Sequence, residues 1–219
     1  MEQYLFRLFL FSSTLLAAAV AGGIKVRSMD SRYRWIVVYL IAGVVNEVIG
    51  FFCGWWFRTN VVNNNFFMLA ELLILNFQFM AWNQDDRKKQ WYLLPVIFFS
   101  GLFLVTSLLQ GVKQPLVYFN FLYCFYLALC ATTWLARLMA TDDRPFYKNA
   151  RAIICSCMMI YFSYRIIVEA FWLYGLNISA AFRIEVQAII RWINLFINFL
   201  YLYALKWIPK KPDYITYYG

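Results

Sequence analysis

The sequence predicts an all-α polytopic membrane protein, a bundle of seven transmembrane helices. Of the 219 residues, 63% are hydrophobic and only 14% are charged, and the mean hydropathy of +0.60 exceeds that of water-soluble domains. The apolar residues occur in continuous runs of about 20, which is the length a helix needs to cross a bilayer. Such runs disfavour a membrane β-barrel, whose strands alternate between apolar and polar residues.

Seven such runs follow one another, separated by short charged or polar connections. The expected spans are about 4–24, 35–57, 61–82, 91–110, 115–138, 152–174 and 184–207. The connections between them are too short to hold a soluble domain, so residues 1–219 are expected to form a single transmembrane domain.

The first span, 4–24, contains the small residues Ala17, Ala18, Ala19 and Ala21, which resemble a signal-peptidase site. Cleavage there would leave the basic connection after it outside the cell. We therefore expect this span to be retained as a helix.

Tryptophan marks the ends of most later spans. Trp35 opens the second span, Trp82 closes the third, Trp91 opens the fourth, Trp134 lies near the end of the fifth, and Trp207 closes the seventh. An indole ring at the end of a span is typical of a side chain that lies among the lipid headgroups. These positions therefore support the expected span ends.

The distribution of basic residues predicts the orientation. Of the 20 Lys and Arg, fourteen lie in the first, third and fifth connections with their flanks and in the tail, and four lie on the opposite side. Basic connections stay in the cytoplasm. The C-terminus is therefore expected to be cytoplasmic and the N-terminus outside, and we expect a multi-pass protein of the bacterial inner membrane.

Several kinds of chemistry are disfavoured by composition. The chain has no histidine, which excludes Ser/His and Cys/His nucleophile pairs and imidazole metal ligands. We therefore expect no enzymatic activity, no catalytic residue, no metal and no cofactor. The net charge of +9 is spread over four basic segments, which favours contact with the lipid bilayer over nucleic-acid binding.

Five charged residues fall inside the expected spans. Each would cost about 2.5–3.5 kcal/mol facing lipid, so we expect all of them to point into the bundle. They lie from the middle of the membrane toward its outer side. The five residues are Glu47, Glu71, Arg165, Glu169 and Arg191.

Neutral polar residues extend these charges into stripes at helical spacing. The most prominent are Asn46, Tyr161, Asn194 and Asn198. The stripes place a polar, charged site between the second, third, sixth and seventh spans, open to the outer side. The first, fourth and fifth spans carry no internal charge and are expected to face lipid more.

The charges also suggest pairings. Arg165 and Glu169 are four residues apart and can pair along one helix, which would leave Arg191 for Glu71 or Glu47. Three glutamates against two arginines leave one carboxylate over. It is protonated, meets water or meets a cation.

Two groups of residues resemble a known set of proteins. Asn64 and Asn65 precede the mid-span Glu71, and the spaced Asn194 and Asn198 lead to an end of the form Trp207 followed by Lys210. This arrangement is similar to that of a group of uncharacterised small seven-helix bacterial inner-membrane proteins. The resemblance implies the seven-helix topology and carries over no activity and no site residue.

Three classes of function stay open. The first is a receptor or transporter whose site binds or senses a small zwitterionic or ionic ligand. The second is a non-catalytic membrane subunit or anchor that binds a membrane-protein partner, with the charges acting as a structural network. The third is a proton- or ion-conducting pore or effector.

Overall fold

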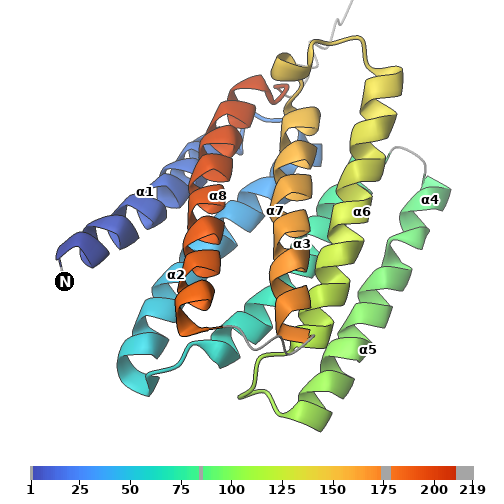
Figure 1. Cartoon of the computed structure of the whole chain (residues 1–219). Helices are drawn as coiled ribbons and strands as arrows, with labels where there is room; N and C mark the ends of the chain where they lie inside the picture. The colour runs from blue at the N-terminus through green and yellow to red at the C-terminus, as the bar shows by residue number, and fades with distance from the viewer. Residues whose placement is uncertain (1, 84–85, 174–178, 211–219) are drawn as a thin grey trace, which may run out of the picture.

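A computed structural model describes residues 2–83, 86–173 and 179–210 (Figure 1). The described residues are almost entirely helical, and none of them belongs to a β-strand. The helices are α1 Glu2–Lys25, η1 Ser31–Tyr33, α2 Arg34–Phe57, α3 Val61–Trp82, α4 Asp86–Trp91, α5 Leu93–Gln110, α6 Val117–Thr141, η2 Phe146–Lys148, α7 Ala150–Leu173 and α8 Ala180–Trp207.

Among the residues that the structure describes, six segments are long and apolar enough to cross a membrane. They coincide with α2, α3, α5, α6, α7 and the larger part of α8. The chain is therefore a multi-pass membrane protein with an all-helical bundle.

The helix ends agree with the expected spans, apart from a few local differences. The fourth span is divided at Tyr92 into α4 and α5. The last helix begins at Ala180, earlier than expected, because the Ser179 hydroxyl accepts a hydrogen bond from the Phe182 amide at 3.2 Å and caps it. Gly111, with a φ of +81°, ends α5 in a conformation that favours glycine. Tyr174, the expected end of the sixth span, lies outside the described residues.

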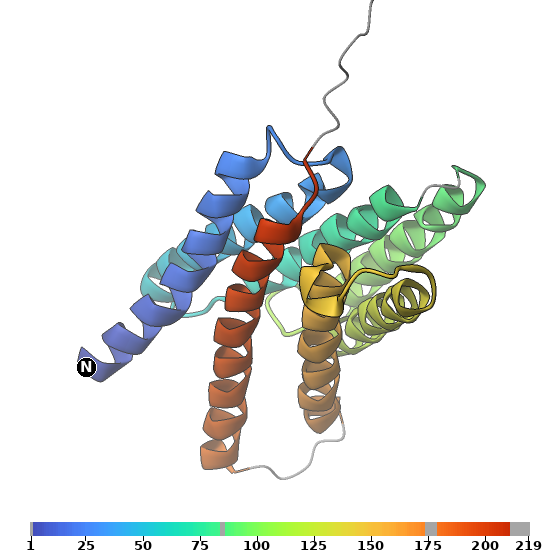
Figure 2. The same ribbon diagram turned by 90° about the horizontal axis from the view of Figure 1, so that it is seen from above.

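The long helices form two rows (Figures 1 and 2). α1, α8, α7 and α6 lie side by side in one row, and α2, α3 and α5 form the second row behind them. Contacts of α1 with α2, and of α6 with α3 and α5, join the rows. The space between the rows is where inward-facing polar side chains from both can meet.

α3 is the helix that anchors the others, and it does so through buried amide side chains. Asn65 donates to the carbonyl oxygens of Val112 and Gln114, at 2.9 and 2.8 Å, and so holds the connection between α5 and α6. Gln78 accepts from the Ile36 amide at 2.7 Å and donates to the Arg32 carbonyl oxygen at 2.6 Å, which holds the start of α2. Each amide satisfies main-chain groups that a helix end leaves without a partner.

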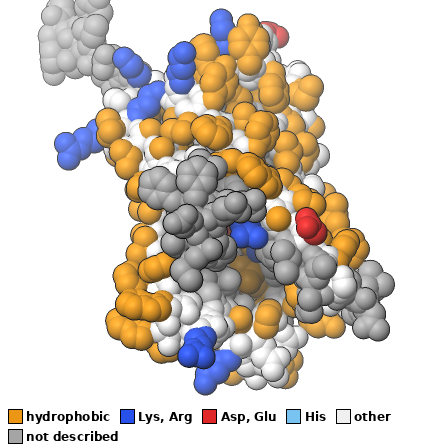
Figure 3. Space-filling view, turned by 60° about the vertical axis from the view of Figure 1, so that its left-hand side comes forward, with side chains coloured by type: hydrophobic (Ala, Val, Ile, Leu, Met, Phe, Trp, Pro, Cys, Tyr) orange, Lys and Arg blue, Asp and Glu red, His pale blue; other side chains and the backbone are white. Residues whose placement is uncertain are grey.

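The connections rich in Lys and Arg meet at one end of the bundle. The Asp30 amide donates to the Pro209 carbonyl oxygen at 2.9 Å, and the Lys25 ammonium group donates to the Leu205 carbonyl oxygen at 2.5 Å. Figure 3 shows Lys and Arg side chains toward the top and the bottom of one face, a smaller basic patch and an acidic side chain near its middle, and hydrophobic side chains over much of the flank. This distribution is typical of a helical bundle whose flank faces lipid.

Candidate functional site

The nine residues expected to form the site all line one of two adjoining cavities between the helix rows. The first, which we call the Glu47 cavity, has a volume of about 240 Å³ and lies among α1, α2, α3, α7 and α8. The second, the Glu169 cavity, has a volume of about 400 Å³ and lies among α2, α3, α6, α7 and α8. Asn46, Phe67 and Tyr161 line both, so the two cavities share a wall.

The most buried charge is Glu71, in the middle of α3. Its residue surface is 0% exposed, and its carboxylate accepts hydrogen bonds from the Tyr39 hydroxyl at 3.1 Å and the Tyr123 hydroxyl at 2.7 Å. The Arg165 guanidinium lies 2.9 Å away and forms an ion pair with it. A buried carboxylate with an opposite charge and two hydroxyl donors has its hydrogen-bonding capacity used inside the protein.

Arg165 contacts groups from three helices. Its guanidinium lies 5.4 Å from the ring centre of Tyr123 and 5.5 Å from that of Tyr161. A second nitrogen donates to the Asn120 side-chain oxygen at 2.7 Å. We call Glu71, Arg165, Tyr123 and Asn120 the buried ion-pair centre. Its many contacts offset the cost of placing an arginine at this depth.

The observed pairing corrects the expected one. Arg165 forms its ion pair with Glu71 on α3, and the Asn120 side chain lies between Arg165 and Glu169, donating from its amide nitrogen to the Glu169 carboxylate. Arg165 therefore takes Glu71, and not Glu169, as its ion-pair partner. The reason is the rotation of α7, which directs Arg165 toward α3 and α6. The expected partner of Arg191, Glu71 or Glu47, stays a prediction, since both carboxylates line one cavity with Arg191.

α6 was expected to face lipid, and this expectation is wrong as well. Its residues Asn120 and Tyr123 are buried at 5% and 0% exposure and complete the centre. They carry no charge, so a search for charged residues inside spans does not find them. Their spacing with Cys124 on one face of the helix is the signal that could have indicated an inward polar stripe.

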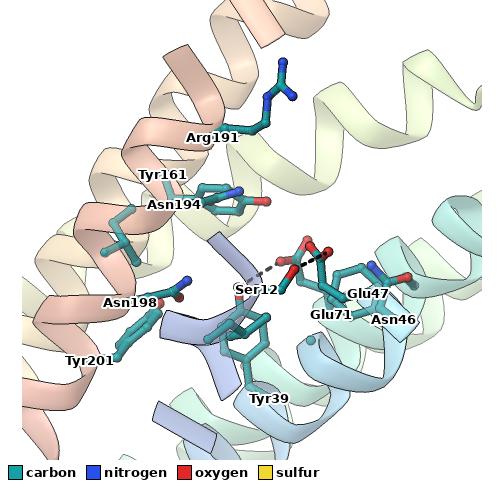
Figure 4. A pocket seen from close by; sticks show the side chains of 14 residues that line it. Ser12, Tyr39, Asn46, Glu47, Glu71, Tyr161, Arg191, Asn194, Asn198 and Tyr201 are labelled. Carbon is teal, nitrogen blue, oxygen red and sulfur yellow. Dashed lines mark hydrogen bonds between the residues drawn. The ribbon is translucent and has the colours of Figure 1, made fainter. Parts of the chain in front are cut away.

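The Glu47 cavity is lined by the buried Glu71 and also by two charged residues that are not buried. Both Glu47 and Arg191 are exposed. Glu47 accepts a hydrogen bond from the Ser12 hydroxyl of α1 at a long 3.4 Å. Figure 4 shows Arg191, Asn194 and the neighbouring α8 side chains on one side of the cavity, and Glu47 with residues of α2 and α3 across from them.

Two further amide contacts hold the walls of the Glu47 cavity. Asn63 of α3 donates to the Asn46 side-chain oxygen at 2.8 Å. Asn198 of α8 donates to the Thr14 hydroxyl of α1 at 3.4 Å and is 8% exposed. Ser12 and Thr14 on α1 were not expected at the site, because a hydroxyl in a span is common and carries no distinctive pattern.

Comparisons with family models, with curated proteins and with solved structures found no match. The fold and the geometry of the two cavities therefore carry the functional conclusion.

Proposed function

We propose that the protein is a membrane receptor that binds a small zwitterionic ligand in the Glu47 cavity, and that it is not an enzyme. The observation that carries the proposal is that a carboxylate, Glu47, and a guanidinium, Arg191, both exposed, line one cavity within the apolar length of the chain. A charge at that depth is costly and is characteristically retained for a function.

The chemistry of the cavity fits an amino acid or a betaine. A guanidinium presents paired N–H donors that match the two oxygens of a carboxylate, and a carboxylate attracts an ammonium group. Asn194 and Asn46 add neutral donors and acceptors to the lining. A ligand with one charge of each sign would meet both charged walls without adding net charge to the membrane interior.

A receptor is favoured over a transporter by the helices that line the site. α2, α3, α7 and α8 each run as one α-helix over their described lengths of 22 to 28 residues. Transporters characteristically build their sites from helices broken near the middle of the membrane. Continuous helices suit a protein that binds and changes its contacts with a partner.

The proposal includes the placement of the chain in the membrane. All seven long helices would span the bacterial inner membrane, with the N-terminus outside and the basic end in the cytoplasm. Single cysteines in a background free of native thiols test it. A cysteine at Asn64 should react with an impermeant thiol reagent in whole cells, and one at Lys148 should not. The opposite pattern would overturn the orientation.

Binding is tested by the thermal stability of the purified protein in detergent. Glycine betaine and a set of free amino acids are added at increasing concentration, and at least one should raise the Tm in a saturable way. The shift should disappear in Glu47→Gln and Arg191→Met and persist in Glu185→Gln, which removes a charge outside both cavities. A zwitterion response that survives in Glu47→Gln would refute the site.

A membrane subunit is the second candidate, and the buried ion-pair centre favours it. Glu71 and Arg165 find their partners inside the chain, so this centre needs no ligand to stabilise the bundle. Mild-detergent purification followed by mass spectrometry tests it. A protein recovered in fixed stoichiometry would support a subunit, and a recovered small molecule would support the receptor.

A further inference from the structure

The Glu169 cavity carries a charge that the zwitterion site does not use. Among the described residues, its charged lining consists of Arg165 and Glu169. Arg165 is part of the buried ion-pair centre, where Glu71 lies 2.9 Å from its guanidinium. Glu71, which lies outside this cavity, therefore balances the positive charge of Arg165. When Glu169 is ionised, its negative charge has no such balancing charge in the cavity lining.

The orientation of Asn120 makes Glu169 a hydrogen-bond acceptor. The Asn120 oxygen accepts from Arg165 at 2.7 Å, so its amide nitrogen is the group that faces Glu169. An amide nitrogen donates and does not accept, which means that Glu169 acts as an acceptor in this contact. The same side chain lies between Glu169 and the guanidinium and forms a hydrogen bond with each of them.

The remaining lining suits an organic cation. Phe67, Tyr161 and Trp172 supply aromatic rings, and rings of this kind attract ammonium groups through their negative faces. The volume of about 400 Å³ lies within the range of about 300–1,000 Å³ typical of sites for small organic molecules. The size of the cavity and its three aromatic side chains favour an organic ammonium ion over a bare alkali ion, which needs a tight shell of oxygen ligands.

The lining also indicates how such a cation would enter. Asn64 near the start of α3, Pro115 before α6 and Trp172 near the end of α7 all line the cavity, and these segments lie at the end of the bundle opposite the basic connections. Asn64 is exposed at this end. A ligand can therefore arrive from the side where Lys and Arg are fewest.

We infer that the Glu169 cavity is a second binding site, for a small organic ammonium ion whose positive group lies against Glu169 and the aromatic lining. This site is separate from the zwitterion site and does not depend on it. Because the two cavities share Asn46, Phe67 and Tyr161, occupancy of one should alter the affinity of the other.

The experiment uses the full chain in detergent and measures Tm and equilibrium binding of ammonium ions that carry no carboxylate. The probes are methylammonium, benzylammonium and choline chlorides, with sodium chloride and sodium acetate at the same concentrations as controls. At least one ammonium salt should give a saturable Tm increase that the sodium salts do not give. Equal responses to sodium chloride, a response to acetate, or no response to any ammonium salt would each overturn the site.

Glu169→Gln tests the residue that carries the inference. Glutamine keeps the volume and an oxygen that can accept from Asn120, so the bundle should fold, and ammonium binding should weaken by about tenfold or more. Glu185→Gln, at an exposed position of α8, removes the same charge elsewhere and should leave the binding unchanged. Unchanged ammonium binding in a folded Glu169→Gln would overturn the inference.

A second variant keeps the test decisive should Glu169→Gln fail to accumulate. Asn64→Lys adds a positive charge at the exposed end of the cavity and should weaken ammonium binding several-fold relative to Asn64→Gln, which changes the same position without adding charge. Equal binding by the two would overturn the site. Zwitterion binding lost in Glu47→Gln with ammonium binding intact would separate this site from the proposed receptor function.

Discussion

The buried ion-pair centre and the Glu47 cavity use the same residue types at neighbouring positions and treat them in opposite ways. In the centre, Glu71 has 0% exposure and three donors from other helices, one of them Arg165. In the cavity, Glu47 is exposed and accepts from Ser12 at 3.4 Å. Both carboxylates line the Glu47 cavity, but Glu71 is buried with its acceptor oxygens occupied by other helices, whereas Glu47 is exposed and more accessible to a ligand. Depth in the membrane alone therefore does not define a functional residue.

The largest effect is expected from Arg165→Met, which breaks the centre. It leaves Glu71 buried without its basic partner, and loss of one member of a buried pair costs about 3–5 kcal/mol. We expect little protein to accumulate in membranes and a strongly lowered Tm in detergent. The double variant Arg165→Met with Glu71→Gln should be milder than Arg165→Met alone. A wild-type Tm for Arg165→Met would show that the centre does not stabilise the bundle.

Glu71→Gln and Glu47→Gln form a matched pair that compares the two regions directly. Glu71→Gln should lower the free energy of unfolding by about 1.5–3 kcal/mol, the usual worth of a hydrogen bond to a charged group. Glu47→Gln removes a charge at low cost and should be as stable as wild type or more so, with ligand binding lost. Thermal unfolding of both variants in one detergent measures the contrast. A destabilised Glu47→Gln with a normal cellular phenotype would give the subunit role first rank.

Arg191→Met should have a smaller effect on stability than Arg165→Met. Arg191 is exposed, and Glu71 already has Arg165 as its partner, so its removal leaves the buried ion-pair centre intact. We expect a change of about 1 kcal/mol or less, as for exposed charges, together with loss of zwitterion binding. A loss of stability as large as that of Arg165→Met would show that Arg191 belongs to the structural network.

The smallest expected effect lies outside the membrane, in the connection between α6 and α7. Hydrogen bonds from the Arg144 side chain, at 2.6 to 3.2 Å, lower the pKa of Asp142 from its ordinary 3.8 to about 2. The ionised carboxylate therefore adds stability above about pH 4, and this contribution is lost as the pH falls toward 2. Arg144 is 51% exposed, which makes the contribution small.

Asp142→Asn should accordingly be slightly less stable than wild type at pH 7, and the difference in Tm should shrink between pH 4 and 2. Asp143→Asn controls for the change in net charge at the neighbouring exposed position. A difference between Asp142→Asn and wild type that stays constant over this pH range would show that the Arg144 contact does not control the titration of Asp142.

The sequence alone predicts the helical class, the approximate ends of the long helices and an inward face for the charged residues in the spans, but it does not reveal the uncharged Asn120 and Tyr123. Apolar runs and the cost of charge in lipid act on one helix at a time. The sequence therefore predicts that Glu47, Glu71, Arg165 and their polar neighbours face inward, without reference to how the helices pack.

The packing of the helices against one another decides which of these residues form the ion pair and which are exposed at a cavity. Arg165 pairs with Glu71 on another helix, while the nearer Glu169 meets Asn120, because the rotation of each helix about its axis sets the partner. That rotation depends on how side chains of neighbouring helices fit together. The separation of the two cavities by a shared wall at Tyr161 likewise exists only once α2, α3, α7 and α8 are in contact.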